Sequence, residues 1–273
     1  MGQYRNEMAL LDTLRKRAEE EGLPLRVILK EALQIYALAA LYSQPASERV
    51  TFQGGTCLRL VHGTPRYSED MDFVTTLDSK ELSVLFEPVS RDVARLAPLF
   101  DGEITLHVQK ATAEISRWRI RYRAAREQDS TSVSLEFAPY PAYSIQRAVL
   151  APPMILPGLP LIVVRAETLE EIMADKVIAV AGRRYIKGRD VFDLWWLKQK
   201  GVKADPELIR KKQSDYHLPP GQLKVNLTLI EAEAIQRELQ HFLPYRYRVQ
   251  VLQKDVLKVM VSEVKGLLAD AIS

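Results

Sequence analysis

Cysteine is nearly absent from this chain of 273 residues, and long apolar runs are absent too. The single cysteine, Cys57, excludes an internal disulfide and fits a reducing compartment, so we expect it to be a small buried residue rather than a nucleophile. The longest apolar runs, such as Ala32–Tyr42, which Gln34 interrupts, are too short to cross a bilayer, and so is Leu161–Val164. The first eight residues lack the apolar core of a secretory leader. We therefore expect a cytoplasmic protein with no membrane partner.

A strong net charge is also missing, because the formal charge is only +3 at pH 7. Total charge therefore does not by itself predict a nucleic-acid-binding protein. Arginines nevertheless gather, interleaved with aromatic residues, in the segments 116–126, 183–189 and 245–248. Such clusters attract phosphates. For any one cluster there is an equally good alternative, in which its charges lie at exposed strand edges and oppose aggregation.

Internal repeats and low-complexity tracts are absent, and the apolar periodicity predicts helices at both ends of the chain with strands between them. The expected helices are residues 6–42 with a break at 22–24, then 56–62, 82–99, 168–184, 189–199, 206–213, 228–241 and 257–272. Thr168 and Thr228, each followed three residues later by a glutamate, are expected to cap the helices that they open. The expected strands are 50–53, the end of 66–75, and 104–108, 114–124, 131–138 and 162–165, of which 104–138 alternate like an antiparallel meander. Six prolines between Pro139 and Pro160 predict irregular or edge structure.

This order of elements predicts an α+β protein with a mixed sheet, flanked by an N-terminal helical segment and a helical C-terminal lobe. We place the core lobe, with the N-terminal helices, at residues 1–165 and the helical lobe at residues 166–273. A chain of this length is sufficient for one large domain or two modest ones.

The most informative residues are two aspartates separated by one apolar residue, Asp70 and Asp72. In an extended strand they project from one face, while Met71 and Phe73 take the opposite, core-facing side. Two carboxylates this close repel each other unless a cation neutralises them, and Mg²⁺ prefers such oxygen ligands. The pattern predicts a metal-dependent phosphoryl-transfer site.

A double glycine precedes these aspartates. Gly54-Gly55 allows a tight turn from strand to helix, and Thr56 is placed to cap that helix, whose backbone N–H groups suit a phosphate. The Gly-Lys-Ser/Thr ending of a Walker A loop is missing. An ordinary turn would also explain a double glycine, so the nearby aspartates supply the argument for phosphate binding.

Two-metal phosphoryl transfer usually needs a third carboxylate on a neighbouring strand, and Glu136 is the best candidate. It shares a strand face with two serines, while Val133, Leu135 and Phe137 share the other face. By the same parity, one face of the preceding strand carries arginines 117, 119, 121 and 123. If the aromatic side joins the core, these arginines lie on the Glu136 face, either as a positive field for phosphates or as a solvent-facing ladder.

Downstream, Lys176 lies at the border of an apolar helix stripe, from which its ammonium could reach a triphosphate. Asp190 and Asp193 lie one turn apart on the next helix and share a face. Solvation of a surface lysine, and helix capping by Asp190, are the alternatives that do not involve catalysis.

Taken together, the segments 54–59, 66–73 and 188–194, with Lys176, resemble the AbiEii/AbiGii-like nucleotidyltransferase toxins. These are the toxin halves of type IV toxin–antitoxin systems and include the MenT-type enzymes. The resemblance covers roughly residues 50–198, and the order and spacing of the segments make it specific. Two positions depart from the family pattern: Gln53, where lysine is common, and Cys57, where alanine is common.

The resemblance implies a DNA polymerase β-like nucleotidyltransferase core in which Asp70 and Asp72 hold Mg²⁺ in a two-metal site and NTP is the substrate. It implies that Asp190 is a further catalytic acid or base, with Asp193 orienting its helix, so the expected catalytic residues are Asp70, Asp72, Lys176 and Asp190. Glu136 is the expected third metal ligand. The expected nucleotide-binding residues are Gly54, Gly55, Thr56, Arg59, Ser68 and Lys176.

By the same resemblance, the acceptor would be RNA, notably the 3′ end of tRNA, so that translation is blocked, and the antitoxin would act without a stable complex. The arginine clusters favour RNA, whereas an acidic cleft would favour a cationic small molecule such as an aminoglycoside. A catalytically silent nucleotide- or RNA-binding protein is the remaining alternative, and it fits poorly with an intact pair of aspartates.

Overall fold

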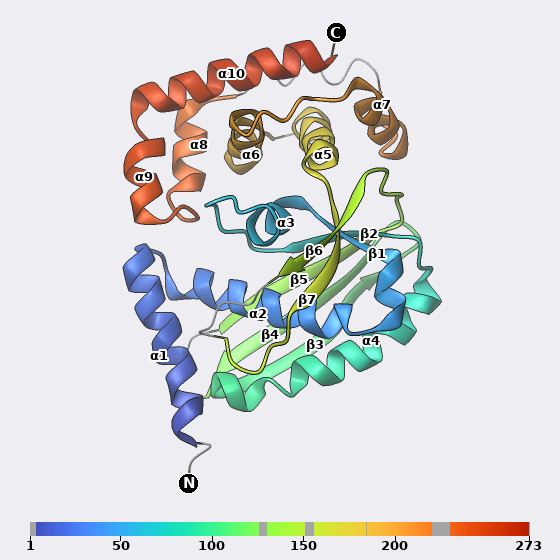
Figure 1. Cartoon of the computed structure of the whole chain (residues 1–273), viewed down its shortest axis with the longest axis vertical. Coiled ribbons are helices and arrows are strands. Elements are labelled where there is room, and N and C mark those ends of the chain that lie inside the picture. Colours follow the sequence, from blue (N-terminus) through green and yellow to red (C-terminus); the bar gives the residue numbers. More distant parts are fainter. Residues whose placement is uncertain (1–3, 126–129, 151–155, 184, 220–229, 273) are drawn as a thin grey trace. The chain divides into compact units, whose positions relative to one another are not determined.

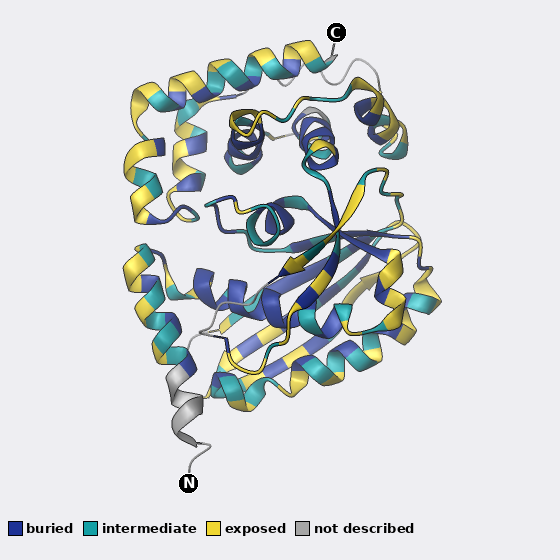
Figure 2. Cartoon of the chain, viewed as in Figure 1, coloured by how far each residue is buried: buried dark blue, intermediate teal, exposed yellow. Residues whose placement is uncertain are grey.

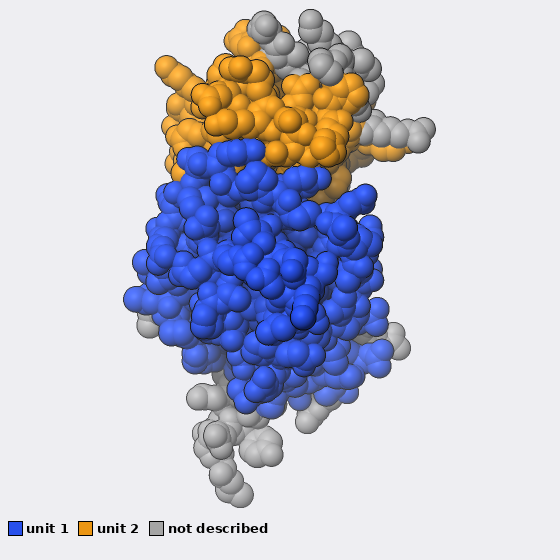
Figure 3. Space-filling view, turned by 90° about the vertical axis from the view of Figure 1, so that its right-hand side faces the viewer, with its two compact units in different colours: residues 1–63, 67–166 blue, residues 64–66, 167–273 orange. Residues whose placement is uncertain are grey.

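The computed structural model describes residues 4–125, 130–150, 156–183, 185–219 and 230–272. The chain divides into two compact units, one formed by residues 1–63 with 67–166 and the other by residues 64–66 with 167–273 (Figure 3). The two lobes expected from the sequence, 1–165 and 166–273, stay a prediction.

The first unit begins with two helices, α1 (Tyr4–Glu21) and α2 (Leu25–Tyr42). The chain turns between them at Gly22, whose φ is 62°, and Pro24 directly precedes α2. Most positions of α2 are buried, because apolar residues occupy most of its circumference. A 3-10 turn, η1 (Pro45–Arg49), then leads into the sheet.

Seven strands form one mixed sheet in the order β3-β4-β5-β2-β1-β7-β6 (Figure 1). Their bounds are β1 (Val50–Gln53), β2 (Met71–Thr75), β3 (Gly102–Ala111), β4 (Ser116–Ala124), β5 (Ser130–Ala138), β6 (Ile145–Leu150) and β7 (Ile162–Glu167). The antiparallel meander expected over residues 104–138 is confirmed as β3, β4 and β5. The sheet is mixed because β2 pairs parallel to β5, and β1 parallel to β7.

One face of the sheet is apolar and is covered by α2 and by α4 (Ser79–Ala94), which leads into the 3-10 turn η2 (Ala97–Phe100). Rings of Phe52, Phe73 and Phe137 stack across three strands on this face, with centroids 5.2 and 5.0 Å apart. Trp118 of β4 packs against Phe137 on one side and edge-on against Phe86 of α4 on the other. This burial anchors the strands that carry the polar residues of the opposite face.

The second unit is helical. Its elements are α5 (Leu169–Gly182), α6 (Gly188–Gln199), α7 (Pro206–Asp215), α8 (Ala232–Leu239), α9 (Tyr245–Val251) and α10 (Lys254–Ile272). Thr168 caps α5, as expected, by accepting a hydrogen bond from the backbone N–H of Glu171. Throughout the described residues, no helix combines the length and the apolar character needed to cross a membrane.

Three local expectations have different outcomes. Irregular or edge structure was expected between Pro139 and Pro160, and residues 145–150, which contain no proline, form the edge strand β6, so edge structure is confirmed there. The helix expected from Thr56 begins instead at Gly54 as α3 (Gly54–Leu60), so Thr56 lies inside the helix rather than at its cap. Helix α8 begins at Ala232, and the expected cap at Thr228 lies outside the described residues.

Candidate active site

The turn between β1 and α3 brings Gly54 against Asp72. Gly54 has φ of 76°, in the left-handed region that side chains rarely adopt, and a Cβ atom built on it would be 2.5 Å from Asp72 Oδ2. Strands β1 and β2 pair antiparallel with Gln53 opposite Asp72, which places the turn beside this carboxylate. Gly54, the first of the two glycines, is therefore required for close approach of the backbone to Asp72, in addition to its use in a tight turn.

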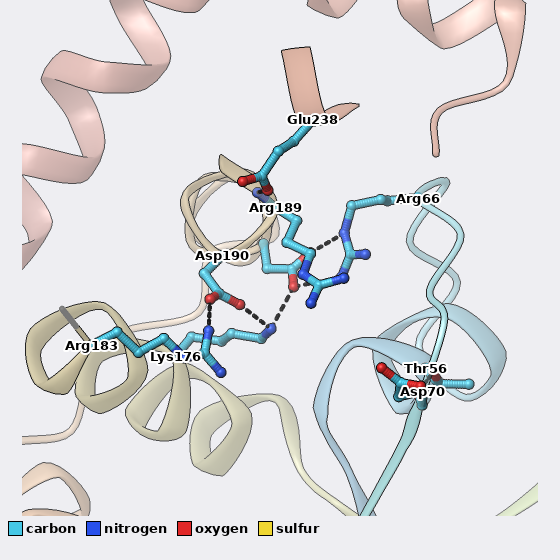
Figure 4. Close-up of polar contacts among 9 residues, drawn as sticks. Thr56, Arg66, Asp70, Lys176, Arg183, Arg189, Asp190 and Glu238 are labelled. Atoms are coloured by element: carbon cyan, nitrogen blue, oxygen red, sulfur yellow. Dashed lines mark hydrogen bonds and ion pairs between the residues drawn. The ribbon is translucent and has the colours of Figure 1, made fainter. Parts of the chain in front are cut away.

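Asp70 lies immediately before β2, half-buried, while Met71 and Phe73 are completely buried as the parity of the strand predicted. Its backbone carbonyl accepts a hydrogen bond from Thr56 Oγ1 in α3 (Figure 4). Its side-chain Oδ1 accepts from the backbone N–H of Ser134 in β5, at 3.4 Å. Thr56 thus holds the backbone of the aspartate segment instead of capping a helix.

Glu136 is the register neighbour of Asp72, because β2 and β5 run parallel with these two residues paired. On its other side, Glu136 pairs in register with Arg117 of β4, and its Oε1 lies 2.8 Å from Arg117 Nε. The expectation that the arginines of β4 share the face of Glu136 is confirmed. In this arrangement Glu136 is engaged in an ion pair.

Asp70 and Asp72 supply half-buried carboxylate oxygens, which are the donors that Mg²⁺ prefers. No group of three or more His, Cys, Asp or Glu residues placed to hold a metal ion occurs within the described ranges. The aspartate pair therefore fits a divalent ion by its chemistry, and Glu136 as the third ligand stays a prediction that requires release from Arg117.

The segment that leads into Asp70 is held by residues of α2. The side-chain amide of Gln34, buried to 1% exposure, donates to the backbone carbonyls of Ser68 and Glu69, both at 3.0 Å. Lys30 Nζ lies 2.7 Å from Glu69 Oε1. These contacts fix the path of the backbone around Ser68, a residue expected to lie beside the nucleotide.

A second cluster supports the same segment through Tyr67. Glu31 of α2 accepts from Arg17 at 2.8 Å and from Arg59 at 2.7 Å. The Arg59 guanidinium lies 3.9 Å above the centroid of the Tyr67 ring, within cation–π range. Arg59 is thus part of a packed cluster of alternating charges, and the nucleotide contact expected for it stays a prediction.

In the second unit, Lys176 of α5 is buried among carboxylates (Figure 4). Its Nζ lies 2.8 Å from Asp190 Oδ1 and 2.7 Å from Asp193 Oδ2, both on α6. Arg183 also pairs with Asp190. The alternative of a solvated lysine is therefore wrong for Lys176, which lies at 8% exposure.

The charges of this network are mutually reinforcing. Burial alone would raise the pKa of the Asp190 carboxyl, but the positive charges of Lys176 and Arg183 lower it to about 2. Burial would likewise lower the pKa of Lys176, yet Asp190 and Asp193 raise it. Lys176 is therefore a fixed cation at neutral pH, and Asp190 is a weak proton acceptor. The acid or base role expected for Asp190 stays a prediction.

Arg66 belongs to the same network. It makes a two-pronged pair with Asp193, from Nε to Oδ1 and from Nη2 to Oδ2, each at 2.8 Å. Both side chains are fully buried, at 1% and 0% exposure. Asp193 is thus held between Arg66 and Lys176, which fixes the direction from which it contacts the lysine.

Sequence reasoning missed Gln34, Glu31 and Arg66. No local motif marks the first two, since they are polar residues on an otherwise apolar helix, and a buried polar position in such a helix was the only available signal. Arg66 stands next to the recognised aspartate segment, but its partner lies 127 residues away.

A family model described as "Nucleotidyl transferase AbiEii toxin, Type IV TA system" matches residues 36–252, which is most of the chain. No curated protein gives a significant match. Among solved structures, the chain is similar to MenT4, a nucleotidyltransferase toxin from Mycobacterium tuberculosis, with a TM-score of 0.68 and 20% identity over 97% of this chain and 89% of that one.

The chain is also similar to JHP933 from Helicobacter pylori, with a TM-score of 0.53 and 19% identity over 92% of this chain and 93% of that one. At such identities these likenesses show the fold. The mixed seven-stranded sheet with its helices is that of the nucleotidyltransferase toxins, as expected from the sequence.

Proposed function

Because this chain belongs to the AbiEii family of nucleotidyltransferase toxins of type IV toxin–antitoxin systems, we propose that it transfers nucleotides from an NTP to an RNA hydroxyl, with release of pyrophosphate. The acceptor we propose is the 3′ end of tRNA, whose modification would block translation. The observation that carries the proposal is the aspartate pair at the start of β2, with Asp72 packed against the Gly54 turn.

Asp70 and Asp72 are the residues that would hold Mg²⁺. When bound, the ion would neutralise the triphosphate and favour ionisation of the attacking hydroxyl. The protein's own part is to position the two carboxylates. Thr56 and Ser134 hold Asp70, and the Gly54 turn leaves room for Asp72.

For the second unit, we propose that Lys176 contacts phosphate as a point charge. Asp190 and Asp193 keep this lysine protonated and fix its position, so they act as positioning residues for it. Arg66 supports Asp193 in that task. Gly54, Gly55, Thr56 and Ser68 stay the proposed nucleotide-binding residues of the first unit.

The acceptor and the donor can be tested in one experiment, in which the purified chain is incubated with total tRNA, Mg²⁺ and each labelled NTP in turn. Label on tRNA with a preferred nucleotide supports the proposal, and label on none overturns it. We expect Asp70→Asn and Asp72→Asn to lower transfer on the order of a thousandfold. Asp92→Asn, which removes a carboxylate from α4, is the matched control and should keep wild-type activity.

The second candidate is transfer to a small molecule such as an aminoglycoside. A parallel reaction that offers an aminoglycoside in place of tRNA separates the two acceptors. Label on the small molecule alone would favour the second candidate. We propose that the chain acts in the cytoplasm and that its antitoxin acts without a stable complex, which co-purification of the two proteins after co-expression would contradict.

A further inference from the structure

The face of the sheet opposite the apolar core carries a row of arginines along β4: Arg117, Arg119, Arg121 and Arg123, here called the arginine ladder. Between them, Trp118, Ile120 and Tyr122 are buried beneath α2 and α4. The alternation of buried and exposed residues along β3 and β4 is visible in Figure 2. The ladder therefore lies on the face that these two helices leave uncovered.

The neighbours of the ladder on both sides are mostly small or neutral. On β5, Arg119, Arg121 and Arg123 face Ser134, Ser132 and Ser130 in register. On β3, Arg119 faces His107 and Arg121 faces Thr105. Among the described register partners, carboxylates stand only at the two ends, where Glu136 pairs with Arg117 and Glu103 faces Arg123.

The middle of the ladder thus has no carboxylate in register beside it. Arg121 and Arg123 are exposed, whereas Arg117 and Arg119 are half-buried. The positive charge of the ladder acts on a neighbouring side chain: burial, followed by the charges of Arg121 and Arg119, lowers the pKa of the His107 imidazole. The positive charge on this face is therefore available to a ligand.

The ladder also has a direction. Alternate residues of a strand stand about 6.6 Å apart, so the four guanidinium groups form a nearly straight row. The row ends at Arg117, whose partner Glu136 is the register neighbour of Asp72. A chain of phosphates lying along the row would be led to the aspartate pair.

We propose that the arginine ladder binds the backbone of single-stranded RNA and directs the acceptor end toward Asp70 and Asp72. This inference rests on the proposed function, because it assigns the acceptor a path on the enzyme. Extended single strands fit better than duplexes, since a straight row of evenly spaced cations follows one backbone, and flanking serines leave the arginine heads uncrowded.

The test measures binding of a fluorescent single-stranded oligouridylate to the full chain without NTP or Mg²⁺. The double variant Arg121→Gln/Arg123→Gln removes two exposed charges from the ladder. The matched control, Arg91→Gln/Arg95→Gln, removes two exposed charges, one in α4 and one at its C-cap, on the covered side of the sheet. We expect about tenfold weaker binding for the ladder variant, and a slope of log K against log salt shallower by about 1.4. The control should match the wild type.

Equal loss in both double variants would overturn the inference, because it would reveal a general charge effect. Equally strong competition by a duplex RNA would also overturn it. Failure here is distinguishable from failure of the proposed function. If the wild-type chain labels tRNA but the ladder variant binds RNA normally, only the proposed RNA path along the ladder is refuted. If no RNA is labelled, the proposed nucleotidyl transfer to RNA is refuted, even if the ladder binds RNA.

Thermal melting of each variant shows whether it is folded. A further variant, Ser132→Glu, leaves all arginines in place and puts a carboxylate opposite Arg121. It should weaken RNA binding to a similar extent, whereas Ser132→Gln should not. Unchanged binding by Ser132→Glu would count against the ladder.

Discussion

Gly54 lies so close to Asp72 that a Cβ atom at residue 54 would be 2.5 Å from the carboxylate oxygen Oδ2. Real Cβ atoms do not approach other atoms so closely, so a side chain at position 54 must displace the aspartate or the turn. The double glycine and the aspartate pair, separate motifs in the sequence, are thereby one structural unit.

We predict that Gly54→Ala lowers nucleotidyl transfer roughly a hundredfold, because it moves the Asp72 carboxylate by a fraction of an ångström or more. Gly63→Ala is a matched control, since Gly63 has φ of 79° but nothing within 4 Å of a built Cβ. Each substitution should cost about 1–2 kcal/mol in backbone strain. Steady-state rates together with melting curves distinguish the effects, and equal activity in the two variants would contradict the prediction.

Gln34→Ala should raise the KM for NTP about tenfold while the chain stays folded. The change leaves the backbone carbonyls of Ser68 and Glu69 without their buried donor, so the segment beside the proposed nucleotide site loosens. Gln44→Ala, which changes a glutamine just after the C-terminal end of α2, is the control. Steady-state kinetics at varied NTP concentration measure the KM. If the KM is unchanged and only the stability of the variant is lower, Gln34 has a purely structural role.

Asp193→Asn should destabilise the second unit by about 3–5 kcal/mol, because it leaves the buried cations Arg66 and Lys176 short of negative charge. Asp255→Asn removes a carboxylate at 95% exposure and should change stability by less than about 0.5 kcal/mol. Urea unfolding of both variants measures the difference. Equal midpoints would show that the network contributes little.

A pH dependence is expected from Glu167, which lies with Glu171 and Asp175 around Lys212 at 3.2, 2.7 and 3.1 Å. Burial, followed by the charge of Asp175, raises the pKa of the Glu167 carboxyl well above its usual value. The folded chain therefore holds this proton more tightly than the unfolded chain. Its stability falls as the pH rises above the unfolded pKa of about 4.3 toward the folded one.

Glu167→Gln removes that titration. The difference in melting temperature, variant minus wild type, should therefore be more positive at pH 8 than at pH 5. Glu170→Gln changes an exposed neighbour on α5 and should follow the wild type at both values. Parallel curves for Glu167→Gln and the wild type across this range would show that the carboxyl keeps an ordinary pKa.

The sequence by itself determined the features that depend on local geometry. The two-residue period of a strand was sufficient to place Met71 and Phe73 in the core and the β4 arginines on the face of Glu136. Capping by Thr168, the helix break at Gly22 and the meander followed from short-range preferences. The motifs in their order were also enough to predict the family.

Only the tertiary structure decided which distant residues meet. The parallel pairing of β2 with β5 puts Glu136 beside Asp72, and α2 supplies the amide of Gln34 to Ser68. Arg66 pairs with Asp193, which lies 127 residues away in the sequence. Such contacts depend on how all the buried surfaces fit together, and a segment's own preferences contain no information about that fit. For the same reason, the sequence left irregular and edge structure open for the stretch that contains β6: an edge strand is stabilised by the neighbour it joins.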